Sequence, residues 1–155
     1  MILYFLRHAD AEAGSGSDFD RNLTPKGLEQ AAKVGRFCKA HGLVADKILT
    51  SPLVRARQTA GIVGKELGID PLVQDWLACG MGIRTLLKQM QAQDKEGSIL
   101  LVGHEPDFST VIGELIGAAE GYGVLVTKAS LTAVDLPWME AGSGQLQFSI
   151  PVRLM

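Results

Sequence analysis

The sequence predicts an α/β protein, a three-layer α/β/α sandwich with a mainly parallel central sheet and a C-terminal antiparallel hairpin. Two observations lead to this fold class. Short apolar runs, typical of strands buried on both faces, alternate repeatedly with segments whose apolar residues have helical spacing. Near the C-terminus, two segments instead alternate apolar with polar residues, which is typical of antiparallel strands with one solvated face.

The first predicted elements are a strand, a loop and a helix. The apolar run at residues 2–6 predicts a buried strand, and the small polar residues 13–18 predict a mobile loop. Thr24 followed by Pro25 is a typical helix start, because threonine caps backbone N–H groups and proline fits the first helical position. We expect Gly42 to stop this helix as the C′ residue just past its end, a position that favours glycine.

The next segments continue the alternation of strands and helices. Residues 47–50 predict a short strand. Ser51 with Pro52 repeats the cap-and-proline signal and predicts a second helix, which Gly68 closes. Residues 72–74 predict a further short extended segment.

The second half of the chain completes the predicted sheet. A helix is expected at residues 83–93, a buried strand at 99–103, and another helix entered through residues 105–107. Residues 130–136 and 145–150 are the two segments with alternating polarity, and we expect them to form the hairpin.

Length and composition predict one domain over residues 1–155. The chain is 46% hydrophobic and 21% charged, as in ordinary globular proteins. No apolar run approaches the roughly 20 residues that cross a bilayer, so we expect no membrane partner. The first strand has no basic segment before it and no cleavage site after it, and Cys38 and Cys79 are too few for a disulfide framework. We therefore expect a cytoplasmic protein.

The charge pattern limits the partners of the chain. Its net charge is −2 and it contains no run of basic residues, so no nucleic-acid partner is expected. Any bound anion is then small or locally displayed on a partner. We take the chain to be a monomer.

Two of the three histidines, His8 and His104, directly follow predicted strands. Ligands of open α/β sheets bind beyond the carboxyl ends of the strands, so both histidines are placed at the expected site. Arg7 precedes the first of them, and a guanidinium matches phosphate oxygens while an imidazole offers a nucleophilic nitrogen near neutral pH. This pair predicts chemistry on a phosphate, although a lone histidine in such a place is more often bonded to nearby backbone.

Two further arginines lie in the first turns of the helix after residue 50. Arg55 and Arg57 are two positions apart and face different directions, so we expect at most one to point into the site, and a solvated charge is the alternative for each. Arg21 is a candidate to fold over the anion, with an exposed position as the equal alternative. Glu105 and Asp107 are expected to be N-terminal helix charges rather than acids in the site.

Four segments together carry the strongest functional signal. In order along residues 1–150 they are Leu6-Arg7-His8-Ala9, Arg21-x-Leu23-Thr24-x-x-Gly27, Ser51-Pro52-x-x-Arg55-Ala56-x-Gln58-Thr59 and Val102-Gly103-His104-x-Pro106. In order and spacing they resemble the histidine phosphatase superfamily, and more narrowly its small branch, the SixA-type phosphohistidine phosphatases.

This resemblance implies a phosphoglycerate mutase-like sandwich that works as a phosphatase. It implies that His8 attacks phosphorus and that water hydrolyses the resulting phosphohistidine. The phosphoryl oxygens would be held by Arg7, Arg55 and His104, and Arg21 matches a family position that can also face the phosphate. No metal and no organic cofactor are implied.

The sequence departs from the family pattern at two positions. Ala9 stands where the superfamily often has glycine, although members of the small branch often have alanine there. Larger members place a carboxylic acid after the strand that corresponds to residues 72–74, and Asp75 is the only nearby candidate for this proton donor. When the P–N bond of a phosphohistidine breaks, its imidazole leaves in the neutral form and needs less help from an acid than an alkoxide does. A phosphohistidine domain of a phosphorylated protein is therefore the favoured substrate, with a small phosphoester as the alternative.

Three other functions remain open from the sequence. Cys79 and Arg84 nearly match the Cys-x5-Arg loop of cysteine phosphatases, but they are one residue too close. A metal hydrolase is opposed by Arg7, although the ligand types are present in His8, Asp10, Glu12 and His104. A non-catalytic module that holds a phosphorylated partner would use the same residues as the enzyme.

Overall fold

Six strands form one sheet within the residues that the computed structural model describes, which are 1–14, 16–93, 97–118 and 123–155. The strand order is β3-β2-β4-β1-β5-β6. The strands are β1 (Ile2–Arg7), β2 (Lys47–Thr50), β3 (Leu72–Val73), β4 (Ser98–Gly103), β5 (Leu131–Asp135) and β6 (Gln145–Ile150).

The first four strands are parallel and the last two form the hairpin. β4 pairs in parallel with both β1 and β2, and β2 pairs in parallel with β3. β5 is antiparallel to both β1 and β6. This topology confirms the predicted mainly parallel sheet with a C-terminal antiparallel hairpin.

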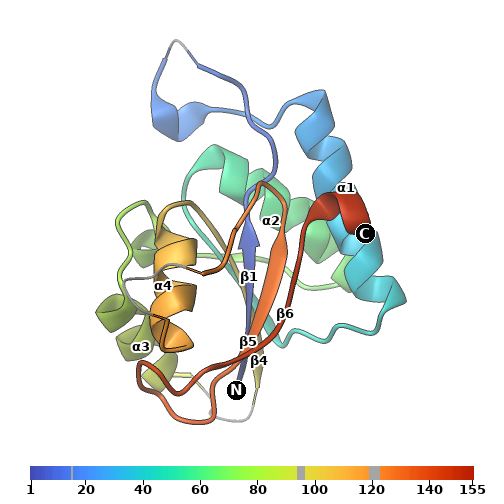
Figure 1. Ribbon diagram of the computed structural model, residues 1–155. Helices are drawn as coiled ribbons and strands as arrows, with labels where there is room; N and C mark the ends of the chain where they lie inside the picture. The colour runs from blue at the N-terminus through green and yellow to red at the C-terminus, as the bar shows by residue number, and fades with distance from the viewer. Residues whose placement is uncertain (15, 94–96, 119–122) are drawn as a thin grey trace.

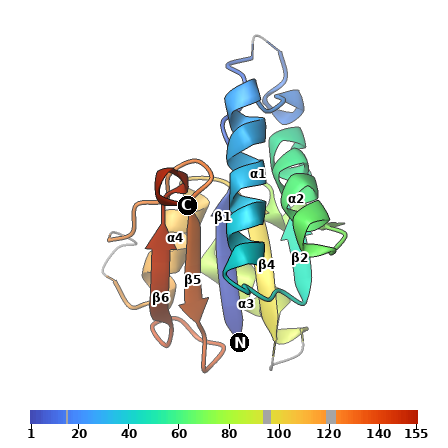
Figure 2. The same cartoon turned by 90° about the vertical axis from the view of Figure 1, so that its right-hand side faces the viewer.

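The helices cover both faces of the sheet. They are α1 (Pro25–Ala40), α2 (Val54–Leu67), α3 (Ile83–Gln91) and α4 (Asp107–Leu115). Figures 1 and 2 show α1 and α2 together on one face and α3 and α4 on the other. The predicted three-layer α/β/α sandwich is confirmed. No helix within the described ranges has the length and apolar character needed to cross a membrane.

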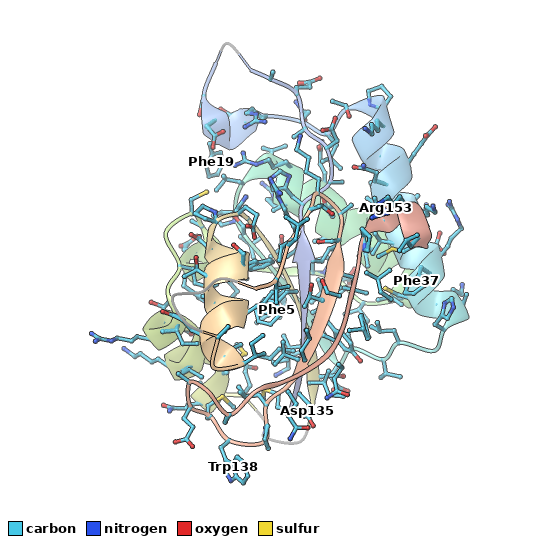
Figure 3. The ribbon with its side chains drawn as sticks, viewed as in Figure 1. Phe5, Phe19, Phe37, Asp135, Trp138 and Arg153 are labelled. Atoms are coloured by element: carbon cyan, nitrogen blue, oxygen red, sulfur yellow. The ribbon has the colours of Figure 1, made fainter. Side chains whose placement is uncertain are left out.

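The central strand β1 contributes to a core on each side of the sheet. Leu3 and Phe5 pack into the cluster under α3 and α4, whereas Tyr4 and Leu6 pack into the cluster under α1 and α2. Figure 3 shows Phe5 between β1 and α4, where its ring meets that of Phe108 edge-on at 5.2 Å. Burial on both faces explains why this strand reads as a continuous apolar run and fixes the position of the residues that follow it.

Most helix boundaries follow the local signals. The Thr24 hydroxyl accepts a hydrogen bond from the N–H three residues later, and Gly68 ends α2 with a φ of 72°. Two boundaries were predicted wrongly. The second helix begins at Val54 rather than next to Ser51, and α3 ends at Gln91, two residues earlier than expected.

The loop after β1 is described only in part. The predicted mobile segment 13–18 includes Ser15, which lies outside the described residues. At its far end, Asp18 begins a single turn of 3₁₀ helix, η1 (Asp18–Asp20). This turn brings a charged residue to the sheet edge where β1 and β4 end.

Candidate active site

The structure brings His8 and His104 together at the carboxyl ends of two neighbouring strands. His8 follows β1, and its N–H donates to the carbonyl of Gly103, the last residue of β4, at 3.0 Å. His104 comes next in the chain, and the two imidazole centroids are 5.2 Å apart. Both residues are buried, with 7% of His8 and 2% of His104 exposed. Parallel pairing thus unites residues that are far apart in sequence.

Hydrogen bonds hold the His8 ring in one tautomer. Its Nδ1 lies 2.8 Å from the Ala9 carbonyl oxygen, which can only accept, so Nδ1 carries the proton. In the neutral ring Nε2 then has a lone pair, and the Arg55 Nε–H donates to it at 3.2 Å. An electrophile whose oxygens bind the Arg55 guanidinium would replace this hydrogen bond and meet the lone pair, so Nε2 is placed to act as a nucleophile.

Arg55 is placed by the first turn of α2 and is only 4% exposed. Thr59, one turn later, donates to the Arg55 carbonyl at 2.8 Å and accepts from the Ala9 N–H at 3.1 Å. One hydroxyl therefore ties α2 to the residue after His8. Arg57 is exposed, as expected from its spacing to Arg55.

The Arg7 guanidinium has a donor that is hydrogen-bonded to backbone and a buried donor that is not. Its Nη1 donates to the Val126 carbonyl at 2.9 Å. Its Nε is buried and, among the described residues, has no hydrogen-bond partner. A buried donor left without an acceptor costs about 1–3 kcal/mol. The oxygen of a bound anion would be a suitable acceptor for this atom.

His104 is oriented by Ser51. The His104 Nε2 lies 2.7 Å from the Ser51 hydroxyl oxygen, which also accepts from the Leu53 N–H at 3.3 Å. Ser51 is fully buried, and among the described residues Nε2 is the acceptor available to its hydroxyl proton, so this proton is directed to Nε2 and the neutral ring carries its own proton on Nδ1. Nδ1 is buried and lacks a partner within the described ranges, so it is ready to donate to an oxygen of a ligand.

Both histidines are uncharged at neutral pH. Burial lowers the pKa of His8 to about 4, and the positive charges of Arg55, Arg7 and Lys128 contribute to the lowering. Burial also lowers the pKa of His104 to about 3, with further lowering by the neighbouring His8 and Arg55. The lone pair of the His8 Nε2 is therefore preserved over the physiological range.

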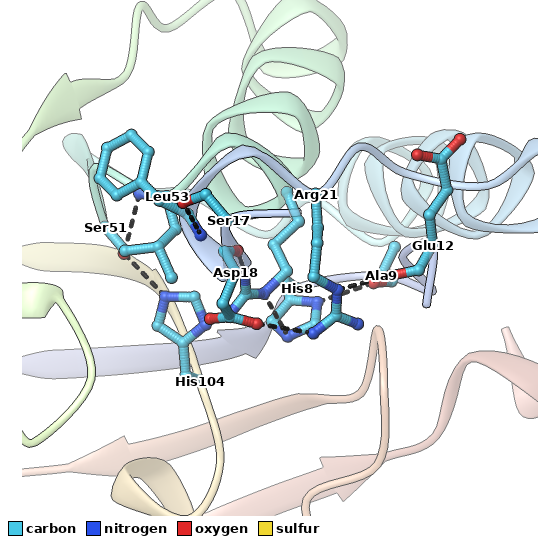
Figure 4. A network of polar contacts seen from close by, with 11 residues as sticks. His8, Ala9, Glu12, Ser17, Asp18, Arg21, Ser51, Leu53 and His104 are labelled. Carbon is cyan, nitrogen blue, oxygen red and sulfur yellow. Dashed lines mark hydrogen bonds and ion pairs between the residues drawn. The ribbon is translucent and has the colours of Figure 1, made fainter. Parts of the chain in front are cut away.

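Figure 4 shows two further charged residues, Asp18 and Arg21, beside His8 and His104. We use the term wall for Arg7, His8, Arg55 and His104, and the term rim for Asp18 and Arg21. The Arg55 guanidinium donates to the Asp18 carbonyl at 2.6 Å and to the Asp18 carboxylate at 3.1 Å. The other carboxylate oxygen of Asp18 accepts from Arg21 at 2.8 Å. Within the described part of the chain, Arg21 is thus connected to the wall through Asp18.

The rim is more exposed than the wall. The Asp18 side chain is 62% exposed and that of Arg21 is 27% exposed. The hydrogen bonds from Arg21 and Arg55 lower the pKa of Asp18, so its carboxylate is ionised at neutral pH. The anionic Asp18 side chain therefore occupies one guanidinium donor of Arg55 and one of Arg21.

The other candidate acids are engaged elsewhere. Asp75 is exposed in η2 (Asp75–Leu77), and no described hydrogen bond or ion pair connects its carboxyl group with the wall. Glu105 accepts from the Ser109 N–H at 2.9 Å and thereby caps α4. Asp107 accepts two backbone N–H groups of the loop before α3, at 2.7 and 3.0 Å. Both carboxyl groups lie at the start of α4, as expected for N-terminal helix charges, and Asp107 in addition fixes the loop before α3.

The geometry also bears on the two other catalytic hypotheses. Partial desolvation raises the pKa of the exposed Cys79 thiol, and the nearby Asp107 and Asp18 contribute, whereas a nucleophilic cysteine needs a lowered pKa. Arg84 is exposed on α3. Asp10 is bound by Lys128 at 2.6 Å, and the described part of the chain contains no cluster of three or more metal-ligating side chains.

Two functional contacts were missed by reasoning from the sequence. Ser51 was interpreted as a helix cap, but its hydroxyl orients His104 and the helix starts three residues later. Asp18 lies among small polar residues that are typical of loops, and its contact with Arg55 spans 37 positions. Local patterns carry no signal for such a contact.

Known proteins share both the sequence pattern and the fold. Residues 3–79 match the family model of the histidine phosphatase superfamily (branch 1). The chain is 31% identical over 130 residues to a phosphohistidine phosphatase SixA homolog of Haemophilus influenzae, covering 76% of this chain and 78% of that protein. It is 25% identical over 154 residues to phosphohistidine phosphatase SixA of Escherichia coli, covering 97% and 93% of the two chains. A solved structure of the protein histidine phosphatase SixA complexed with tungstate superimposes with a TM-score of 0.88 at 24% identity, over 99% of both chains.

The relative from Haemophilus influenzae is similar enough, over most of both chains, to establish the family, and the tungstate complex establishes the shared fold. The chain therefore belongs to the SixA-type branch of the histidine phosphatase superfamily and is a phosphatase.

Proposed function

We propose that this protein hydrolyses the phosphoryl group of a phosphohistidine carried by a partner protein, through a covalent phosphohistidine on His8. The observation that supports this most directly is the His8 Nε2 lone pair, which lies 3.2 Å from the Arg55 Nε in a buried and uncharged ring. The nucleophile and a cation for the phosphoryl oxygens are thus in the same place.

The reaction proceeds in two displacements. In the first, the substrate imidazole takes a proton from solvent on its free nitrogen, Nε2 of His8 attacks phosphorus, the P–N bond of the substrate breaks, and the imidazole leaves in its neutral form with the electron pair. Arg7, Arg55 and the Nδ1–H of His104 donate to the phosphoryl oxygens as charge develops on them. In the second, water attacks phosphorus, the bond to Nε2 breaks, and the protons of the water leave with the phosphate.

The state of the carboxyl groups favours phosphohistidine over an alkyl phosphate. An alkoxide leaving group needs a proton from a nearby acid. Asp18 is ionised because two arginines bind it, and Glu105 and Asp107 already accept backbone N–H groups. Asp75, the proton donor considered from the sequence, is exposed. The leaving group of a phosphohistidine is an imidazole that can take its proton from solvent, so its departure depends less on such an acid than that of an alkoxide.

The test compares wild type with His8→Ala on a phosphohistidine peptide and on an alkyl phosphomonoester. We expect His8→Ala to lose turnover on the order of 10³-fold or more, because it removes the nucleophile. His41→Ala is the matched control, since His41 is exposed and stacks on Phe37 at the end of α1. A rapid-quench experiment with radiolabelled substrate should trap phosphate on His8 during a single turnover.

The alternatives have different signatures in the same experiment. Equal or faster turnover of the alkyl ester would identify a broad phosphomonoesterase. Binding of the peptide without label on His8 would identify a non-catalytic phospho-binding module. Five properties stay predictions: that the protein is a monomer, is cytoplasmic, forms a single domain, needs no metal and binds no nucleic acid. Size-exclusion chromatography tests the monomer, and turnover in the presence of a chelator tests the independence of metal.

A further inference from the structure

A groove of about 730 Å³ lies between the start of α1, the segment before β5, strand β6 and the C-terminal turn η4 (Val152–Leu154). Figure 3 shows Arg153 of η4 beside α1, level with the carboxyl end of β1. The side chains that line the groove include Asp10, Lys26, Leu125, Lys128, Leu146 and Arg153. We call it the basic groove, and it contains no residue of the wall or the rim.

The basic groove adjoins the wall. Asp10 comes two residues after His8, and the Lys128 Nζ donates to the Asp10 carboxylate at 2.6 Å. The positive charge of Lys128 contributes to the lowered pKa of His8, so Lys128 lies within electrostatic range of the ring. Val126, two positions earlier, accepts a hydrogen bond from Arg7. The segment that forms one side of the groove therefore also supports the wall.

The charge of the groove is opposite to that of the whole chain. Three cationic side chains line it and one carboxylate, Asp10, is paired with Lys128. Lys26 and Arg153 are exposed and form no ion pair with any described residue. Because the net charge of the chain is −2, this local excess of positive charge is not a general property of its surface. It favours an acidic ligand.

The apolar side chains of the groove favour an extended ligand. Leu125 is 82% exposed and Leu146 is 43% exposed. Small-molecule sites enclose most of their ligand within a concave, mainly apolar pocket. A leucine as exposed as Leu125 is removed from water only by a partner with a broad surface, which indicates a protein segment.

We propose that the basic groove binds the segment next to the phosphohistidine of the substrate protein, and that this segment combines acidic side chains with an apolar one. The inference rests on the proposed function, because it assigns the groove to the same substrate whose phosphoryl group reaches His8. A partner with these side chains would gain affinity from the groove without contacting the wall.

The test uses three substrates and three proteins. The substrates are a phosphohistidine peptide flanked by glutamate and leucine, the same peptide with lysine in place of glutamate, and free phosphoramidate. The proteins are wild type, Lys26→Glu with Arg153→Glu, and the control Arg36→Glu with Lys88→Glu, which changes the charge equally at exposed sites outside the groove. Lys26 lies in the first turn of α1, where a glutamate is favoured by the helix dipole, so folding should be preserved.

Wild type is expected to prefer the acidic peptide. Reversal of the two groove charges should lower kcat/KM for that peptide about tenfold, mainly through KM, with turnover of phosphoramidate unchanged. The control should keep the preference of wild type. An unchanged KM in the groove variant, or an equal loss on all three substrates, would overturn the proposal. A wild-type protein that turns over neither peptide overturns the proposed function as well, and this pattern differs from a defect confined to the groove variant.

Discussion

The wall of the site comes from strand ends and a helix, whereas the rim comes from a single helical turn on a loop. Wall side chains are nearly all buried and are fixed by contacts with backbone and hydroxyl groups, such as that of His8 with Ala9. The rim consists of the exposed Asp18 and the half-buried Arg21, which pair with each other, and Asp18 also pairs with Arg55. The difference indicates that the side chains of the wall are held in place before a substrate binds, whereas a substrate can displace the Asp18 carboxylate of the rim.

The largest expected difference between wall and rim is the loss of kcat on matched substitution of Arg55 and Arg21 by lysine. Arg55→Lys keeps the charge but loses the fork that contacts both His8 and Asp18, so we expect kcat to fall on the order of 10²-fold. Arg21→Lys keeps a positive charge at the half-buried Arg21 position of the rim, and its kcat should stay within about threefold of wild type. Steady-state kinetics on a phosphohistidine peptide measure both, with thermal unfolding as a check on folding. Similar losses in the two variants would contradict the distinction.

The pH dependence of stability provides a second way to separate the two layers. The folded-state pKa values of His8 and His104, about 4 and 3, lie below the 6.5 of an exposed imidazole, so the unfolded chain binds protons first. The stability held by these neutral rings is present above pH 6.5 and is lost as the pH falls toward 4. Between pH 7 and pH 5, each ring should lower the free energy of unfolding by about 2 kcal/mol.

Asp18 of the rim titrates in a different window. Its pKa is lowered from 3.8, so its contribution is present above that value and is lost only as the pH falls below it. Urea unfolding of wild type and His104→Asn at pH 7 and pH 5 tests the prediction, because the variant should lose about half of the decrease. An equal decrease in both proteins would show that the wall histidines are not responsible.

The sequence predicts the wall better than the rim because the two depend on contacts of different range. The positions of His8 and His104 follow from apolar runs that end beside them, and strand burial is visible in a local pattern. Ser51 has a strong local signal for helix capping, but its contact with His104, 53 positions away, is the one that forms. Asp18 meets Arg55 only because a loop folds back over the sheet edge. Neither contact can be inferred from neighbouring residues.

The smallest expected effect concerns competition between the rim and a bound phosphate. Asp18 accepts hydrogen bonds from two Nη atoms of Arg55, through its carbonyl and its carboxylate, and a phosphoryl oxygen would use the same donors. Asp18→Asn removes the negative charge with little change in shape. Because the side chain is 62% exposed and screened by solvent, inhibition by inorganic phosphate should tighten only about threefold.

The neighbouring Asp20 provides the control for this prediction. It belongs to the same turn and is exposed, but it is in no ion pair with a described residue. Asp20→Asn changes the net charge equally, so a general effect of charge would tighten phosphate binding in both variants. We expect the effect only in Asp18→Asn, and we expect it to shrink at high salt, because the repulsion that it removes lies at the surface. If phosphate instead bound more weakly to Asp18→Asn, Asp18 would be a residue that orients Arg55 for the ligand, and the rim would belong functionally with the wall.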